Sequence, residues 1–87
     1  MRDDAQYAVS ARLAQDLDKA RKAHLSAAKR FDEIVAEVPS GLPHPDGAFR
    51  VEEAGNESRR ALEAYRVALH RLSGFLLRGE IPDDLKP

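Results

Sequence analysis

The sequence contains no cysteine and no tryptophan, and its only aromatic residues are two tyrosines and three phenylalanines. Without cysteine, neither a disulfide bond nor a cysteine-bound metal can stabilise the fold, so a hydrophobic core must do so. The chain of 87 residues, 1–87, is long enough for one domain only. A chain of this length buries a smaller fraction of its surface than a typical domain does. Burial against a partner would therefore add stability.

No charge of one sign dominates, because 14 basic residues are balanced by 15 acidic ones and the net charge is −1. Such a chain lacks the broad field that steers proteins to nucleic acid or to an anionic membrane. Long hydrophobic runs are also missing, and residues 1–18 are too charged for a signal peptide. We therefore expect a cytoplasmic protein with no nucleic acid and no membrane partner.

Sequence motifs of catalysis are equally scarce. The chain has no HExxH or ExxH pattern, no GxSxG, no cysteine nucleophile and no glycine loop of the kind that cradles phosphate. We expect a protein that is not an enzyme and carries no cofactor. A site assembled across a dimer interface would escape a search of single-chain motifs, so this alternative stays open.

Glycine and proline are absent from Asp4 to Val38, where alanine, leucine and charged helix formers dominate. This stretch predicts a helix over about 4–38. Its apolar residues recur at intervals of four and three, a heptad seam in which only His24 is not plainly apolar. The seam residues are Leu13, Leu17, Ala20, His24, Ala27, Phe31, Ile34 and Val38.

A second seam predicts another helix, over about 50–78. Its residues are Val51, Ala54, Ser58, Ala61, Tyr65, Ala68, Leu72 and Phe75. Arg78 and Gly79 suit a helix C-terminus, because a basic charge and a left-handed glycine both favour that end. Gly55 and Gly74 are the expected weak points.

The two seams mesh when the chain folds back on itself. Eight layers result: Val38 with Val51, Ile34 with Ala54, Phe31 with Ser58, Ala27 with Ala61, His24 with Tyr65, Ala20 with Ala68, Leu17 with Leu72, and Leu13 with Phe75. Large residues face small ones in several layers, which favours close packing. The sequence therefore predicts an all-α fold, an antiparallel two-helix hairpin with residues 79–87 as a short tail.

A column of leucines beside the second seam widens the apolar stripe beyond what one partner helix can cover. It contains Leu62, Leu69 and Leu76. The first helix carries a smaller column, Tyr7, Ala14, Ala28 and Val35, interrupted by Arg21. We expect a homodimer in which two hairpins form a four-helix bundle through these leucines. Another oligomer, or an unknown protein partner, is the alternative.

His24 is the polar residue of the seam. A metal site in a bundle usually places a glutamate three residues from the histidine, but the turn neighbours of His24 offer no ligand, so no metal is expected. The register places Tyr65 opposite, which predicts a buried polar pair joined by a hydrogen bond. His70 points outward on the heptad wheel and is expected at the surface.

The connector, about 39–49, is longer than most links between bundle helices and rich in proline. Two interpretations compete. In one, Leu42 and Phe49 fold down and plug the end of the bundle. In the other, His44 and Asp46 present a stiff docking surface, although Asp46 is also a candidate cap for the second helix.

These features favour a small module that acts through protein contacts. The alternative from another functional class is a small-molecule or metal-binding bundle that uses His24, Tyr65 and Ser58 from both subunits of a dimer.

Overall fold

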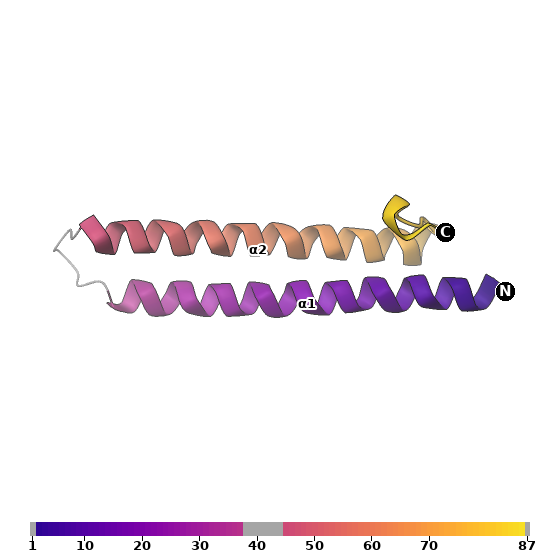
Figure 1. Cartoon of the computed structure of the whole chain (residues 1–87), viewed down its shortest axis with the longest axis horizontal. Coiled ribbons are helices and arrows are strands. Elements are labelled where there is room, and N and C mark those ends of the chain that lie inside the picture. Colours follow the sequence, from indigo (N-terminus) through magenta and orange to yellow (C-terminus); the bar gives the residue numbers. More distant parts are fainter. Residues whose placement is uncertain (1, 38–44, 87) are drawn as a thin grey trace.

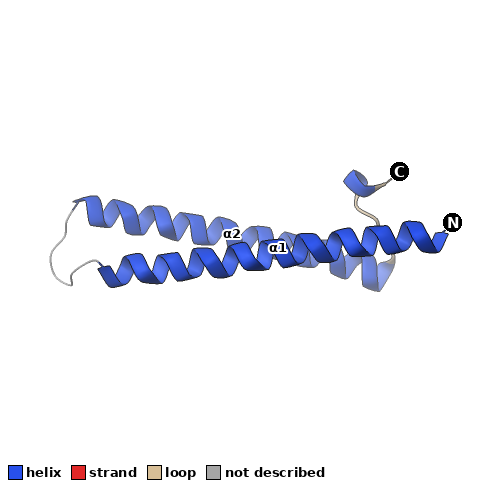
Figure 2. Ribbon diagram, turned by 60° about the horizontal axis from the view of Figure 1, so that its bottom comes forward, coloured by secondary structure: helices blue, strands red, loops and turns tan. Residues whose placement is uncertain are grey.

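The structure, a computed structural model, describes residues 2–37 and 45–86. Helix α1 (Arg2–Glu37) and helix α2 (Pro45–Arg78) lie side by side and run in opposite directions, and a short 3₁₀ helix, η1 (Asp83–Leu85), follows them (Figures 1 and 2). The molecule is a rod of 63 × 19 × 17 Å with both termini at one end. The predicted helical hairpin is confirmed.

Both helices are continuous, as their lack of strong breakers predicts, but α2 begins five residues earlier than the expected residue 50. Pro45 is its first residue, where a missing N–H is harmless and the ring presets a helical φ. Asp46 is therefore the second helical residue and not the N-cap, so that prediction was wrong. Gly55 neither delays nor ends α2.

The C-terminal end of α2 follows the prediction. Gly79 has φ +70°, and its N–H donates to the carbonyl of Phe75 at 2.9 Å. This left-handed cap closes the helix after Arg78. The chain then turns back toward α2, and the N–H of Leu85 donates to the carbonyl of Pro82 at 2.9 Å. Such a fold-back of the tail was not foreseen.

The register of the hairpin agrees with the layers expected from the two seams. His24 and Tyr65 meet with ring centroids 5.7 Å apart. Ion pairs mark the same register at other levels, where Arg50 of α2 reaches Glu37 of α1 at 3.2 Å. The two heptad patterns therefore mesh along the helices.

Burial separates the two seam positions of the heptad, written a to g with His24 and Tyr65 at position a and Ile34 and Ala54 at position d. Among the described residues, the five buried hydrophobic side chains all occupy d: Leu13, Ala27, Ile34, Ala54 and Ala68. The seam residues at a are only half-buried: Leu17, His24, Phe31, Val51, Ser58, Tyr65 and Leu72. The other seam residues at d, Ala20, Ala61 and Phe75, are half-buried. Full burial of the seam is thus confined to d, while every described seam residue at a stays partly open.

Neither α1 nor α2 contains, within the part of the chain that the structure describes, an apolar stretch that is long enough to traverse a lipid bilayer.

Candidate interaction surface

One long side of the rod carries mainly apolar side chains. On a helical wheel, position e lies next to a, so the half-buried a residues and the e residues of both helices share one side, which we call the open face. A Cβ atom built on Gly55, at e of α2, would lie 3.4 Å from the ring of Phe31, at a of α1. The a and e residues of the two helices are therefore neighbours at this level. The open face follows the length of the hairpin.

Three leucines of α2 form the centre of this face. Leu62 is half-buried, Leu69 is 46% exposed and Leu76 is 64% exposed. Val35 and Tyr7, at the same heptad position on α1, are also exposed. The leucines predicted as a dimer interface thus lie together on one side of the hairpin, where Leu69 and Leu76 are exposed.

The opposite side carries a ladder of charge at position g, next to d, and we call it the charged face. Three ion pairs cross from α1 to α2 there at multiples of seven residues along each helix. They are Glu37 with Arg50 at 3.2 Å, Arg30 with Glu57 at 3.8 Å, and Asp16 with Arg71 at 3.9 Å. Each pair lies near the surface and contributes little stability, but all three can form together in only one register of the two helices.

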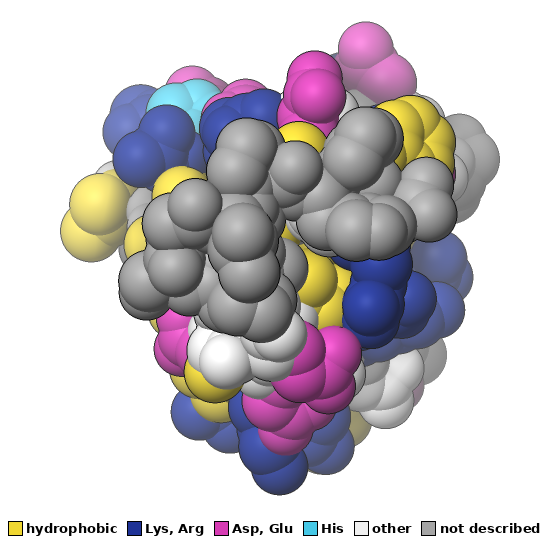
Figure 3. Space-filling model, turned by 90° about the vertical axis from the view of Figure 1, so that its left-hand side faces the viewer, with side chains coloured by type: hydrophobic (Ala, Val, Ile, Leu, Met, Phe, Trp, Pro, Cys, Tyr) yellow, Lys and Arg dark blue, Asp and Glu magenta, His cyan; other side chains and the backbone are white. Residues whose placement is uncertain are grey.

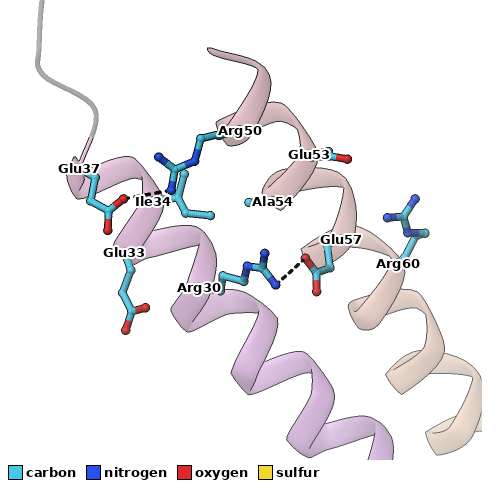
Figure 4. Close-up of a pocket in the computed structure, with 9 residues that line it drawn as sticks. All are labelled: Arg30, Glu33, Ile34, Glu37, Arg50, Glu53, Ala54, Glu57 and Arg60. Atoms are coloured by element: carbon cyan, nitrogen blue, oxygen red, sulfur yellow. Dashed lines mark hydrogen bonds and ion pairs between the residues drawn. The ribbon is translucent and has the colours of Figure 1, made fainter. Parts of the chain in front are cut away.

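A shallow groove of about 500 Å³ lies on the charged face near the connector end (Figure 4). The buried layer of Ile34 and Ala54 forms its floor, and the small alanine leaves the hollow open. Its charged rim is Arg30, Glu33, Glu37, Arg50, Glu53, Glu57 and Arg60. Figure 4 shows the arginines at positions 30 and 50 turned toward Glu57 and Glu37.

This groove has both signs of charge, and two of its arginines are already paired with its own glutamates. Viewed from the connector end, the rod likewise shows basic, acidic and hydrophobic side chains around its outline (Figure 3). Within the described residues, no three histidine, aspartate or glutamate side chains are grouped so that they would hold a metal ion. The groove therefore offers no concentrated field for an anion or a cation.

The polar layer in the middle of the hairpin differs from the expected one. His24 and Tyr65 are in contact, but their rings stack with 22° between the planes, and no hydrogen bond joins them in the described structure. Both side chains are half-buried. The His24 Nδ1 atom is buried without a hydrogen-bond partner. A ring contact thus stands where a hydrogen bond was predicted.

A clasp of charged side chains holds the tail against the two helices. The Arg71 Nη2 atom donates to both carboxylate oxygens of Asp84, at 2.9 and 2.8 Å. Arg71 also lies 3.9 Å from Asp16, which accepts from the Arg12 Nε atom at 3.1 Å. Both helices and the tail thus meet at Arg71, on the charged side and away from the open face.

Two carboxyl groups on the surface have lowered pKa values. The Lys22 ammonium, 2.9 Å from the Asp18 carboxylate as the helical spacing predicts, lowers the pKa of Asp18, and Arg21 adds to the effect. Arg78 donates to Glu80 at 2.9 Å and lowers the pKa of Glu80. These shifts come from exposed ion pairs. His70 is exposed, as expected.

Of the residues named in the two connector hypotheses, only some lie within the part of the chain that the structure describes. His44 and Leu42 lie outside the described residues, as does the side chain of Asp46. Phe49 lies on the first turns of α2 and is 61% exposed. Because α2 begins at Pro45, Phe49 belongs to the helix and points away from α1. The expectation that Phe49 plugs the bundle end was therefore wrong.

No protein-family model matches the chain, and no curated protein or solved structure is similar to it at a significant level. Inference of function accordingly starts from the geometry of the hairpin.

Proposed function

We propose that this chain is a non-enzymatic interaction module whose open face binds a second copy, so that two hairpins form a four-helix bundle. The observation that carries the proposal is the asymmetry of burial across the seam: the buried side chains all lie at d, the a residues are half-buried, and Leu69 and Leu76 at e are exposed. A stripe over a, d and e is typical of helices in a bundle, whereas an isolated pair of helices needs only a and d.

The size of the uncovered surface supports the same proposal. The chain exposes 6817 Å², against about 5,100 Å² for a compact monomer of its 9.7 kDa mass. One side of a rod of 63 by 19 Å also offers more than the ~800 Å² per partner that stable interfaces bury. Twofold pairing would let this one surface cover itself.

A charge on the open face tests the proposal. Leu69→Glu places a carboxylate in the middle of the proposed interface, where it would be desolvated, so we expect the dimer to dissociate or the protein to unfold. Leu77→Glu is the matched control, because Leu77 is 78% exposed at position f, outside the open face. Sedimentation equilibrium of both variants should show loss of the dimer for Leu69→Glu alone. Equal masses for the two variants would contradict the proposal.

The unpartnered Nδ1 atom of His24 favours a second candidate, a ligand or metal site built from His24, Tyr65 and Ser58 of both copies. A ligand that binds only the folded bundle must raise its melting temperature. A thermal-shift series with Zn²⁺, Ni²⁺ and Cu²⁺ therefore tests this candidate, with His24→Leu as the control that should abolish any shift.

A further inference from the structure

The two edges of the open face carry opposite charge. Position b borders e on each helix, and on α1 it holds Asp4, Asp18 and Asp32, fourteen residues apart, with Ala11 and Leu25 between them. On α2 the same position holds Arg59 and Arg66, between Glu52 and Ser73. All of these side chains except Ala11 and Ser73 are exposed. One edge of the face is therefore acidic and the other is basic over its middle.

Bulk is also distributed unequally between the two helices. At position e, α2 presents three leucines after Gly55, whereas α1 presents the small residues Ala14 and Ala28 among larger ones, with Val35 at the level of Gly55. The hairpin register places Ala28 at the level of Leu62, and Ala14 at the level of Leu76. Arg21, at the level of Leu69, is the charged residue of the α1 column. It is paired with Asp18 at 3.5 Å, so its stem can cover apolar surface while its head stays at the edge.

From these two asymmetries, and given the dimer proposed above, we infer that α1 of each copy packs on α2 of the other, with the twofold axis parallel to the bundle. This arrangement brings the acidic edge of each copy against the basic edge of its partner. It also sets each alanine opposite a leucine. The other face-to-face dimer, with its axis across the bundle, would join acidic to acidic edges and leucines to leucines.

A twofold axis along the bundle leaves every layer at its own level, so the contacts can be named. Asp32 follows Phe31 and Arg59 follows Ser58, and these two seam residues share a layer. Asp32 therefore faces Arg59 of the second copy. No ion pair engages Asp32 or Arg59 within the described residues, and Arg59 donates a hydrogen bond to the neutral Asn56 side chain. Leu25, exposed on the acidic edge, faces the aliphatic stem of the second copy's Arg66.

Charge reversal tests the pairing of edges. Asp32→Arg and Arg59→Asp should each weaken dimerisation by roughly tenfold, since each creates two like-charge contacts per dimer. The double variant in one chain should restore the affinity. Glu33→Arg is the matched control, because it makes the same charge change one residue away on the charged face, and it should leave the affinity unchanged. Sedimentation equilibrium gives each dissociation constant.

Cysteine pairing tests the arrangement independently, and the natural chain has no cysteine to interfere. Ala28→Cys and Leu62→Cys are made in separate chains, so no disulfide can form within one hairpin. Oxidation of the mixture should give the mixed disulfide dimer in excess of either self-linked dimer. Self-linked products alone, or a dimer that Asp32→Arg does not weaken, would overturn the arrangement and leave the dimer standing. A wild-type monomer would overturn both.

Discussion

Two glycines near the end of α2 differ in backbone conformation: Gly79 is left-handed and Gly74 is helical. Gly79 takes φ +70°, where a side chain is strained, and a Cβ there would have open space but an unfavourable backbone. Gly74 is helical, and a Cβ there would lie 3.0 Å from a Glu80 carboxylate oxygen and 3.1 Å from an Arg78 nitrogen. Both are the ends of flexible side chains in an exposed ion pair, so they can move at small cost.

Replacing each glycine by alanine should therefore change stability in opposite directions. Gly79→Ala should lower the free energy of unfolding by about 1 kcal/mol, whereas Gly74→Ala should raise it by up to ~1 kcal/mol through helix propensity. Chemical denaturation at one fixed protein concentration compares the two. A destabilised Gly74→Ala protein would mean that the tail packs more closely over α2 than described.

His24 is a polar residue at a half-buried position of the seam. Because its Nδ1 atom is buried without a partner, His24→Leu should raise the free energy of unfolding by ~1 kcal/mol or more. Tyr65→Phe keeps the ring stack, so it should change stability by less than ~0.5 kcal/mol. Thermal unfolding of both variants measures this. If His24→Leu instead destabilises the protein, the nitrogen has gained a partner in the assembled bundle.

At the scale of elements, much of the hairpin could be predicted because it depends on periodic patterns. The heptad spacing of Ile34 and Ala54 fixed a common layer, and the glycine after Arg78 fixed the end of α2. The start of α2 was missed because proline reads equally as a loop residue and as a first helical residue. Because of that error Phe49 was expected in the connector, whereas it lies on α2 and is 61% exposed.

The side chains that join elements were less predictable. Asp84 is thirteen residues from Arg71, and no periodic pattern connects a tail to the helix on which it folds. The stack of His24 on Tyr65 was likewise beyond the sequence, which places two residues in one layer but does not set the angle between their rings. The position of Leu62, Leu69 and Leu76 on one side of α2 could be predicted because they share one heptad position. Their role in a dimer stays a prediction.

The clasp at Arg71 gives a prediction for the tail. Asp84→Asn removes the carboxylate that accepts two bonds from Arg71, so the tail should open more often while the hairpin remains folded. Global stability should fall by less than ~1 kcal/mol, as for exposed ion pairs. Hydrogen exchange at the Leu85 and Lys86 amides should accelerate severalfold. Asp83→Asn is the control at the Leu85 amide, because it removes only the exposed pair of Asp83 with Lys86 at 3.0 Å. Equal acceleration at Leu85 in both variants would contradict a role for the clasp.

At the scale of the whole molecule, the hairpin is long and thin. Its radius of gyration is 18.3 Å, whereas a compact chain of this length has a value of about 12 Å. In a single layer of two helices the buried seam residues all lie at d, and the a and e residues stay half-buried or exposed, so they remain free to pack against another layer. We therefore propose that the hairpin is one half of a four-helix bundle.

Small-angle scattering with in-line light scattering tests this central claim most directly. At micromolar concentration the wild-type protein should have about twice its 9.7 kDa chain mass, while its longest dimension stays near 63 Å because the hairpins pack side by side. A stably folded protein with the mass of one chain would contradict the account, and so would a dimer of much greater length, in which the hairpins meet end to end.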